Sequence, residues 1–540
     1  MNKVLLVPFA SGFLLLAALP TAYASDPKPE QGFGYRTVSG DFNGDGYDDL
    51  AVGNPSDTAV NTDGQRVEGG SVHLFYGSDS GLSEQLWEVW FQDAKVFPKG
   101  MIETGDQFGY ALAAGDINGD GFDDLAIGAP GEDINIGDKT IRDAGVVNFL
   151  YGSQNGLVTD TAQTWYQSQQ ALPGISENDD GFGMALAIGD FDNDGYGDLA
   201  VGVPLEDVGN IKDMGVVVIL RGSANGLTPE QVTEWHQNKY GVTSTGHDGE
   251  MFGFSLVSGD FNADNIDDLA IGVPHDMVTT WKLGPPKDED KAKASETKPE
   301  ETGAVNVLYG SSVDGLRTDN DQWWHQNIKN IEALAEKDDL FGWSLAAGDF
   351  NGDRVDDLAI GIPGESLKKE RNVKRPGAVE ILFGQAGSGL SADNDQFWHQ
   401  ASNIQSVIED NDYFGAALAS GDFDNDGIDD LAIGVPGEDV GNIHDAGLVN
   451  VLYGAYGKGL IDVGQVWHQN KIGVKGSARN RDQFGSALAA GDFDGSGSYD
   501  LAIGNPSDKE GSADGSVNVL YGGVPVGLSD ALDELVFSNP

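Results

Sequence analysis

Residues 40–55 read GDFNGDGYDDLAVGNP, a dense acidic segment that runs directly into an apolar one. Its first part, Asp41 to Leu50, holds four aspartates, one asparagine and two glycines within ten residues. A calcium loop, an acidic active site and a hydrophilic turn can all have this composition. The rest of the chain helps to decide between them, because the segment is repeated.

The segment occurs seven times, each time inside the same larger unit. Its first aspartate stands at Asp41, Asp116, Asp190, Asp260, Asp349, Asp422 and Asp492, at spacings of 75, 74, 70, 89, 73 and 70 residues. In each unit a Phe-Gly pair precedes the acidic loop, and an apolar run ending in Gly-x-Pro follows it. An alternating segment such as GAVNVLYG at 303–310 and a Gly-Leu turn come next. Six units end in Trp-x-Gln, at Trp90, Trp165, Trp235, Trp324, Trp398 and Trp467.

Each unit predicts four short β-strands separated by Gly, Pro, Asn and Asp turns, without the apolar period of a helix. A four-stranded sheet repeated seven times predicts an all-β, seven-bladed β-propeller with antiparallel blades. A linear β-solenoid, the competing fold, has shorter coils. We expect one domain over 25–540 that closes by packing of blade one against blade seven. The expected blades span 31–100, 101–175, 176–246, 247–335, 336–408, 409–478 and 479–540.

The charge of the chain restricts its partners. It carries 87 acidic against 31 basic side chains, a net charge of −56. A surface this negative repels phosphate backbones and anionic lipid, so we expect no nucleic-acid partner. There is no cysteine. Stability must therefore come from packing and from bound metal rather than from disulfides.

The first 24 residues predict a signal peptide. They combine Lys3, an apolar core and Ala22-Tyr23-Ala24 before Ser25, where cleavage is expected. The apolar stretch between Pro8 and Pro20 has 11 residues, whereas a membrane span needs about 20. We therefore expect no membrane span and an exported mature chain, either periplasmic or extracellular.

The acidic loops have the pattern of an oxygen-ligand metal site. Numbered from the first aspartate, side-chain oxygens fall at positions one, three, five and nine, and a glycine at six permits the bend. Hard oxygen ligands suit Ca²⁺, and the absence of nearby His or Cys argues against zinc. An EF-hand needs a glutamate at position twelve, where every copy has Val or Ile, so an EF-hand is excluded. The predicted side-chain ligands are Asp41, Asn43, Asp45 and Asp49; Asp116, Asn118, Asp120 and Asp124; Asp190, Asp192, Asp194 and Asp198; Asp260, Asn262, Asp264 and Asp268; Asp349, Asn351, Asp353 and Asp357; Asp422, Asp424, Asp426 and Asp430; and Asp492, Asp494, Ser496 and Asp500.

Three loops depart from the pattern. Loop four has Ala263 and Asn265 where other copies have glycine, and asparagine tolerates the left-handed conformation. Loop five has Arg354 at position six, which is sterically worse and adds positive charge. Loop seven has Ser496 at position five. Loops five and seven are therefore expected to bind calcium least well.

These residues also carry a family resemblance. Phe-Gly, then D-x-[DN]-x-[DN]-G-x-x-D, then Gly-Ala-Pro at 128–130 resembles the FG-GAP repeat of integrin α-subunit heads and their bacterial relatives. The resemblance implies up to seven Ca²⁺ ions, each held between the first and second strands of a blade on the lower face. It adds a backbone carbonyl at position seven to each ligand set, from Tyr47, Phe122, Tyr196, Ile266, Val355, Ile428 and Ser498. The Trp-x-Gln ending and the greater repeat length are departures from the integrin pattern.

No catalytic residues are predicted. The chain has no Gly-x-Ser-x-Gly elbow, HExxH motif or phosphate-binding loop. Four of the eight histidines, His236, His325, His399 and His468, lie in repeated Trp-His-Gln segments, and this periodicity favours a structural role. A glycosidase-type carboxylate pair leaves no distinctive spacing and stays an alternative.

Acidic residues also recur in the loops expected on the upper face, opposite the calcium loops. They are Glu132, Asp133, Glu206, Asp207, Glu438 and Asp439 after Gly-x-Pro, and Asp106, Asp180, Glu250, Asp339, Asp412 and Asp482 two residues before Phe. They are interpreted as solvated charges or, alternatively, as an acidic collar for a basic partner. A segment rich in Pro, Lys and Glu at 282–302 predicts a disordered loop. Lys368, Lys369, Arg371, Lys374 and Arg375 form one basic sector beside it, proposed as a partner-contact edge.

Together these features predict a non-enzymatic, exported, calcium-binding propeller that acts as an adhesion or protein-interaction module in the manner the integrin-like resemblance implies. Its upper loops are expected to bind a protein or a cell-surface or glycan ligand, and the chain is expected to be a monomer. One alternative is a carbohydrate-binding lectin, which would use the repeated Trp with His or Tyr as exposed edge aromatics. Another is a hydrolase or lyase that uses the propeller as a scaffold.

Overall fold

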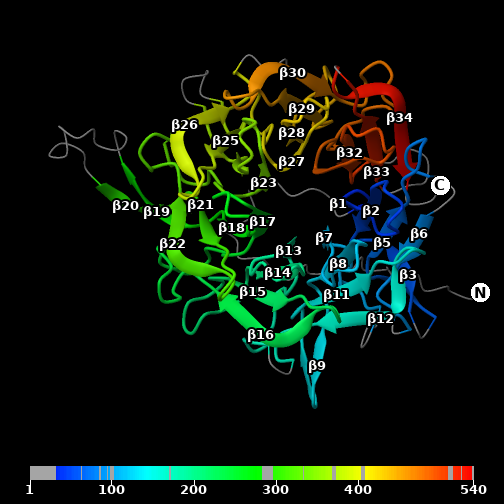
Figure 1. Cartoon of the computed structure of the whole chain (residues 1–540), viewed down its shortest axis with the longest axis vertical. Coiled ribbons are helices and arrows are strands. Elements are labelled where there is room, and N and C mark those ends of the chain that lie inside the picture. Colours follow the sequence, from blue (N-terminus) through cyan, green and yellow to red (C-terminus); the bar gives the residue numbers. More distant parts are fainter. Residues whose placement is uncertain are drawn as a thin grey trace, which may run out of the picture.

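Seven four-stranded antiparallel sheets surround a central axis in the computed structural model of the chain (Figure 1). The structure describes residues 32–537 except 62–63, 84–86, 94, 98–101, 170–171, 282–295, 332–333, 368–372, 403–407, 509–514 and 525. These residues form strands, turns and bends without an α-helix, and none of their segments is a helix able to cross a membrane. The predicted all-β, seven-bladed propeller is confirmed.

The four strands of a blade follow one another in the sequence. The innermost strands are β1 (Arg36–Gly40), β7 (Ala111–Gly115), β13 (Ala185–Gly189), β17 (Ser255–Gly259), β23 (Leu345–Gly348), β27 (Ala417–Gly421) and β31 (Ala487–Gly491). The second strands are β2 (Asp49–Asn54), β8 (Asp124–Ala129), β14 (Asp198–Val203), β18 (Asp268–Val273), β24 (Asp357–Ile362), β28 (Asp430–Val435) and β32 (Asp500–Asn505). The third strands are β5 (Ser71–Phe75), β11 (Val146–Tyr151), β15 (Val216–Arg221), β21 (Ala304–Tyr309), β25 (Ala378–Phe383), β29 (Leu448–Tyr453) and β33 (Ser516–Tyr521). The outer strands are β6 (Trp87–Trp90), β12 (Val158–Trp165), β16 (Thr228–Trp235), β22 (Arg317–Trp324), β26 (Ser391–Trp398), β30 (Ile461–Trp467) and β34 (Ser529–Phe537).

The second strands are buried over their whole length. In β8, for example, all six residues of DLAIGA are buried, and the same holds for the second strand of every other blade. A strand covered on both faces is continuously apolar rather than alternating. Each sheet is covered on both faces because it is packed between two neighbouring blades.

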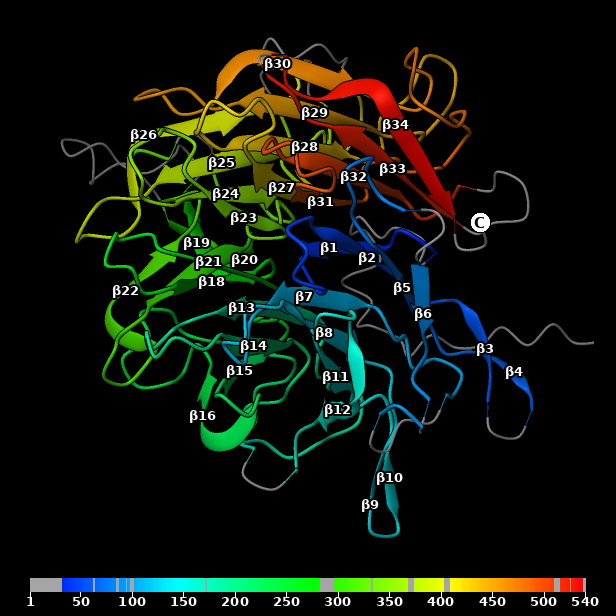
Figure 2. The same cartoon turned by 45° about the vertical axis from the view of Figure 1, so that its right-hand side comes forward.

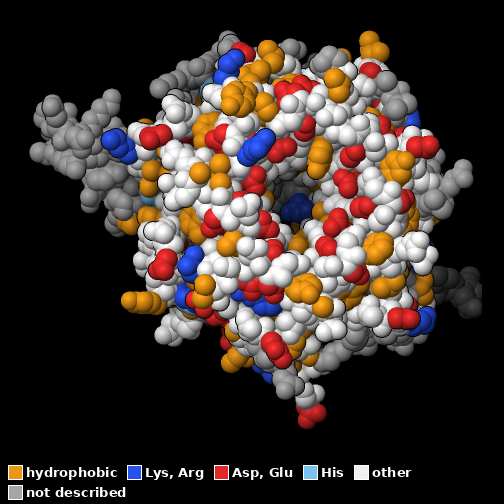
Figure 3. All heavy atoms as spheres, viewed as in Figure 1, with side chains coloured by type: hydrophobic (Ala, Val, Ile, Leu, Met, Phe, Trp, Pro, Cys, Tyr) orange, Lys and Arg blue, Asp and Glu red, His pale blue; other side chains and the backbone are white. Residues whose placement is uncertain are grey.

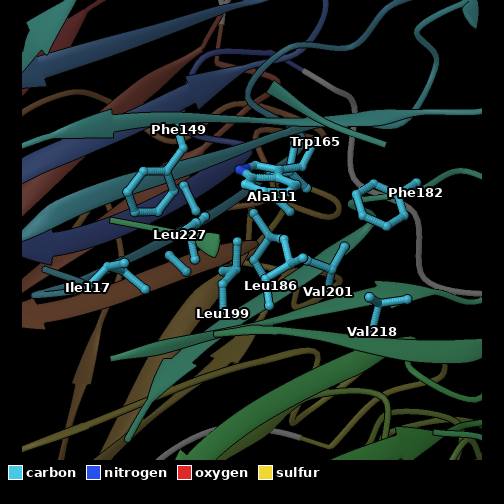
Figure 4. Close-up of a cluster of buried hydrophobic side chains, with 14 of the residues drawn as sticks. Ala111, Ile117, Phe149, Trp165, Phe182, Leu186, Leu199, Val201, Val218 and Leu227 are labelled. Carbon is cyan, nitrogen blue, oxygen red and sulfur yellow. The ribbon is translucent and has the colours of Figure 1, made fainter. Parts of the chain in front are cut away.

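The hydrophobic core is divided among the seams between blades. Within the described residues, seven clusters of buried side chains each combine residues of two adjacent blades. In the seam between blades two and three, Phe149 and Trp165 meet Phe182, Leu186 and Val201 (Figure 4). The Phe of every Phe-Gly pair is fully buried in such a seam. The repeated Phe is therefore an inter-blade packing residue.

Close backbone approach at the seams explains the glycine of the LAIG run. A Cβ placed on Gly128 would lie 2.1 Å from the carbonyl oxygen of Gly183 in the next blade. Real Cβ atoms do not approach an oxygen so closely, so any side chain at this position would push the two blades apart.

The ring closes without a shared strand. Blade one consists of β1, β2, β5 and β6, and blade seven of β31 to β34. Their seam has the same links as the internal seams, including a parallel bridge between Phe33 and Gly515. The backbone N–H of Leu82 donates to the Tyr521 hydroxyl at 3.0 Å. Closure therefore depends on side-chain packing and on hydrogen bonds between the ends of the chain.

Three blades carry an extra hairpin between their second and third strands. These hairpins are β3 (Thr58–Val60) with β4 (Arg66–Glu68), β9 (Ile134–Ile136) with β10 (Lys139–Ile141), and β19 (Met277–Trp281) with β20 (Glu296–Glu301). They project from the ring (Figures 1 and 2). The expectation of a disordered loop over 282–302 is therefore wrong for 296–301, because these residues pair with β19, whereas 282–295 lie outside the described residues. The predicted signal peptide and Lys368, Lys369 and Arg371 also lie outside them.

Candidate metal centre

Each acidic loop joins the innermost strand of a blade to its second strand. Loop one begins directly after β1 and reaches Asp49, the first residue of β2. All seven loops have this position, so the predicted ligands at positions one to nine gather in seven equivalent turns at one end of the strands. We call this end of the ring the lower face. The Phe-Gly pairs precede the innermost strands and lie at the opposite end, the upper face.

The loop is held by hydrogen bonds from its own backbone to its carboxylates. The Asp41 carboxylate accepts N–H bonds from Gly44 at 2.7 Å and from Gly46 at 2.9 Å. The Asn43 Oδ1 atom accepts the N–H of Asp45 at 2.9 Å. The acidic residues therefore shape the turn before any metal is considered, since Asp and Asn side chains readily accept nearby backbone N–H groups.

The ninth residue connects the loop to the third strand. The buried Asp49 carboxylate accepts the N–H of Phe42 at 3.1 Å and that of Gly77 at 2.9 Å. Burial, assisted by the other carboxylates of the loop, raises the pKa of Asp49, Asp124, Asp268, Asp357, Asp430 and Asp500 to about 8 and that of Asp198 to about 7. Without a cation, the six carboxyl groups with a pKa of about 8 hold a proton near neutral pH.

Three loops bring three carboxylates close together. Among the described residues, clusters with ligand oxygens within 4.8 Å of one another are Asp190, Asp192 and Asp194; Asp422, Asp424 and Asp426; and Asp492, Asp494 and Asp500. One buried oxygen in each cluster has no hydrogen-bond partner, namely Oδ1 of Asp192, Asp424 and Asp492. A buried carboxylate oxygen without a donor is costly, and a hard cation satisfies it. The residues of loops six and seven therefore fit Ca²⁺, although the sequence placed loop seven among the two weakest. In loop three the side chain of Arg221, described below, lies against the same carboxylates.

The other four loops have asparagine at position three. In loops four and five the amide Nδ2 of this residue donates to the buried ninth carboxylate, at 3.1 Å from Asn262 to Asp268 and from Asn351 to Asp357. These contacts satisfy the ninth carboxylate with a neutral donor. Loops one and two hold their asparagine against the backbone instead, as described for Asn43.

The departures at position six do not change the path of the loop. Arg354 has φ of 69° and Asn265 has φ of 61°, close to the 85–88° of the glycines at this position. An arginine in the left-handed region costs about 1–2 kcal/mol. Loop five therefore keeps its turn at some cost in strain.

Arg221 is a site residue that the loop motif does not include. The glycine that follows the third strand is preceded by tyrosine in five blades, by Phe383 in blade five and by Arg221 in blade three, so the exception was visible in the sequence. The guanidinium is buried and lies 3.1 Å from the Asp192 carboxylate, and it also donates to Asp198. Loop three therefore contains a cation supplied by the chain itself.

The eighth residue was also missed. In five loops it is an aspartate whose carboxylate accepts the N–H of the first loop residue in the preceding blade, at 2.8–2.9 Å: Asp48 from Asp492, Asp123 from Asp41, Asp267 from Asp190, Asp356 from Asp260 and Asp429 from Asp349. In blades three and seven this position is Gly197 and Tyr499. These side chains thus link the loops across five of the seven seams on the lower face, and Asp48 does so at the closing seam between blades seven and one.

The acids expected on the upper surface are largely buried, which corrects both interpretations of them. Asp106, Asp180, Glu250, Asp339, Asp412 and Asp482, together with Glu132, Glu206 and Glu438, are shielded in the seams, while Asp133, Asp207 and Asp439 are half-buried. In five of the six Trp-x-Gln segments the glutamine donates to a buried acid of the next blade, for example Gln167 to Glu206 at 2.9 Å. Burial raises the pKa of Asp106 to about 8 and that of Glu132 to about 10. These acids are seam residues because the neighbouring blade covers them.

The Trp residues of the Trp-x-Gln segments are also packed inward. Trp165, Trp235, Trp324 and Trp467 are buried, and Trp90 and Trp398 are half-buried. The lectin alternative assumed that these Trp side chains are exposed at the edge of the propeller, and this assumption is wrong. Among the histidines, His325 is buried, and burial lowers its pKa to about 4.

Comparison with known proteins places the repeats in a family. The FG-GAP repeat family matches residues 33–75, 108–147, 182–220, 252–287, 341–381 and 414–452, one segment in each of the first six blades. Bovine phosphatidylinositol-glycan-specific phospholipase D is 26% identical over 416 residues, which cover 76% of this chain and 43% of that protein. Integrin alpha-PS2 of Drosophila melanogaster is 31% identical over 272 residues, 49% of this chain and 17% of that one. The chain thus spans less than half the length of these relatives.

Among solved structures, the exotype rhamnogalacturonan lyase YesX aligns with a TM-score of 0.36 and 12% identity, over 83% of this chain and 66% of that one. The six matched segments, the integrin relatives and the seven equivalent blades agree with one another. The chain is therefore an FG-GAP repeat protein, and its propeller resembles that of the integrin α subunits.

Proposed function

We propose that the chain is an exported, calcium-loaded propeller that binds a protein or cell-surface ligand through its upper face, as an adhesion or protein-interaction module. The observation that carries the calcium part is the buried carboxylate oxygen in each of loops six and seven that has no hydrogen-bond partner among the described residues. Bound calcium supplies positive charge that offsets the repulsion among three carboxylates within 4.8 Å of one another.

The chain's own residues prepare these sites. Backbone N–H groups orient the first carboxylate of each loop, and the ninth carboxylate anchors the loop to the third strand, as Asp430 does by accepting the N–H of Gly454 at 2.8 Å. At ten times its dissociation constant, one calcium ion stabilises the folded state by about 1.4 kcal/mol, so the two sites contribute about 3 kcal/mol. This is a substantial share of a net stability of about 5–15 kcal/mol.

The binding part of the proposal is supported by the projecting hairpins. The hairpins β3–β4 and β9–β10 arise from neighbouring blades and expose apolar side chains, with Val60 62% and Ile136 41% exposed. Apolar side chains displayed by neighbouring loops on a rigid scaffold are a common feature of protein-binding surfaces.

Two experiments test the two parts separately. Equilibrium dialysis and thermal unfolding with calcium or EDTA test the sites, and an unchanged melting temperature together with no retained calcium would refute them. Attachment of protein-coated beads to intact cells tests the binding surface. We expect Val60→Asp combined with Ile136→Asp to reduce attachment, whereas Val313→Asp, at an 80% exposed site in a lower turn, leaves it unchanged. Equal attachment by all variants would refute the binding proposal without affecting the calcium result.

An enzymatic role has weaker support. The phospholipase D relatives are enzymes by name, but the chain is only 26% identical to them and spans 43–45% of their length. Their activity is therefore not carried over to this chain.

A further inference from the structure

A cavity of about 650 Å³ lies on the axis of the ring, at the end opposite the acidic loops. It is lined by the first residues of the innermost strands and by the residues directly before them, whereas the acidic loops follow the other ends of these strands. The space-filling view shows the molecule hollowed at the axis, with a basic side chain inside the opening (Figure 3). A volume of this size is typical of small-ligand sites.

The cavity has an aromatic side and an open side. The residue after each Phe-Gly pair lines it, and this residue is large in blades one to five and small in blades six and seven: Tyr35, Tyr110, Met184, Phe254, Trp343, Ala416 and Ser486. The rings of Tyr35 and Tyr110 lie 5.2 Å apart, and those of Phe254 and Trp343 lie 4.7 Å apart. The fold tolerates alanine and serine at this position, so packing alone does not account for the aromatic residues.

One arginine enters this cavity from the wall. Arg36 begins β1, and the corresponding residue of the other six blades, two positions after the Phe-Gly pair, is Ala or Ser. Its guanidinium carbon lies 4.7 Å from the centre of the Tyr35 ring and 6.0 Å from that of Tyr110. Its one hydrogen bond within the described chain goes to the Tyr35 carbonyl at 3.2 Å, and it forms no ion pair with any described carboxylate.

A half-buried guanidinium without a carboxylate partner is unexpected in a chain with 87 acidic residues. Arginine pairs readily with carboxylates through its planar fork of N–H donors. The other charged residues at the cavity, Arg481 and Asp445, lie 3.9 Å apart and pair with each other. Arg36 therefore leaves the cavity with a local positive charge that an anionic ligand can neutralise.

Three further donors at the cavity have no partner in the described part of the chain. The hydroxyls of Tyr110 and Tyr413 and the indole N–H of Trp343 make no hydrogen bond to any described residue. The nearby hydroxyls of Ser255 and Ser344 are already used, because each donates to a carbonyl of the next blade at 2.7 Å. The free groups therefore suit a ligand that carries several hydroxyl groups around an apolar ring face.

We propose that the axial cavity binds an acidic sugar ring, with the carboxylate of a uronic acid on Arg36 and the ring face against the aromatic side chains. The carboxylate accepts the guanidinium donors, and the sugar hydroxyls bond to the phenol and indole groups. The ligand is either a free sugar acid or the terminal residue of an acidic polysaccharide. The site is independent of the calcium loops and of the projecting hairpins.

Calorimetry on the full chain, in calcium and 150 mM salt, tests the proposal with D-glucuronate and its neutral counterpart D-glucose. We expect glucuronate to bind at least tenfold more tightly than glucose. Arg36→Gln should weaken glucuronate binding at least tenfold, and Arg36→Lys should weaken it less. Trp343→Ala, which introduces the residue that blade six has at this position, should weaken both sugars. Arg66→Gln, in the exposed strand β4, is the matched control and should bind as the parent does.

Circular dichroism and melting temperatures establish that each variant is folded before its affinity is compared. Failure to bind either sugar, equal affinity for both, or unchanged glucuronate binding by folded Arg36→Gln would overturn the proposal. A glucuronate oligomer distinguishes the two sources. Tenfold tighter binding of the oligomer supports the end of a polysaccharide, and equal binding supports a free acid.

Discussion

Replacing Arg221 by tyrosine tests whether loop three uses a side chain in place of a metal ion. Tyrosine is the residue that five of the other blades have at this position. In the parent chain the Arg221 guanidinium lies 3.1 Å from Asp192 and also contacts Asp198, and the arginine and Asp198 are buried. The substitution removes this cation and leaves the two carboxylates facing each other.

The expected cost depends on calcium. Removing one partner of a buried ion pair costs about 3–5 kcal/mol. Because Asp192 is 20% exposed, we expect the free energy of unfolding in EDTA to fall by about 3 kcal/mol, at the low end of this range. With saturating calcium the carboxylates of loop three gain a replacement cation, and most of this loss should be recovered. The number of calcium ions bound should rise by about one.

Urea unfolding in EDTA and in calcium measures the stability change, and equilibrium dialysis counts the ions. The reciprocal variant Tyr453→Arg places a guanidinium beside Asp424 and Asp430 in blade six, and it should remove one ion. If Arg221→Tyr binds the same number of ions as the parent chain, or loses as much stability in calcium as in EDTA, the interpretation of Arg221 as a built-in cation is wrong.

Three further predictions concern the seams and the loops. Asp48→Ala removes the acceptor for the Asp492 N–H at the closing seam and should lower the free energy of unfolding by about 1–3 kcal/mol. Asp356→Ala removes the corresponding acceptor at an internal seam and should have a similar effect. If urea unfolding shows that neither variant loses stability, the role of position eight is contradicted. Gln326→Leu removes the side-chain amide that donates to the buried Glu365 carboxylate at 2.6 Å. It should lower the free energy of unfolding, measured in urea, by about 1–3 kcal/mol. In EDTA the raised pKa of the ninth carboxyls, about 8 in six loops, means that the folded chain holds more protons than the unfolded chain between about pH 4 and 8. The melting temperature in EDTA should therefore fall as the pH rises through this window. In calcium the melting temperature should depend less on pH, and calcium binding should release protons. A melting temperature in EDTA that does not change with pH would contradict these pKa values.

Much of the fold could be predicted because it depends on local sequence patterns that repeat along the chain. The acidic turn, the apolar LAIG run and the Gly-Leu turn each specify a local conformation, and their order specifies four strands in every unit. The position of the acidic loops followed from the same order, since Asp49 and its counterparts directly precede the second strand. The oxygen-rich composition of the loops also indicated the class of metal.

The environment of the individual side chains could not be predicted from one repeat. The sequence shows that Glu132 and Glu206 are acidic and lie in loops, but only the neighbouring blade decides that they are buried. Burial then changes their chemistry, because it raises their pKa to about 10 and about 8. Glu206 also accepts a hydrogen bond from Gln167 of the preceding blade. Trp165 was mistaken for an exposed residue for the same reason.

The sequence by itself thus determined the number of blades, their strands and the composition of the seven loops, because these depend on residues close together in the chain. The tertiary structure decided which groups meet across the seams. It brings Arg221 to Asp192, Asp48 to Asp492 and Arg36 to the aromatic residues on the axis. Asp48 and Asp492 are separated by 444 residues. Their contact forms only when the ring closes, so it cannot be predicted from a local sequence pattern.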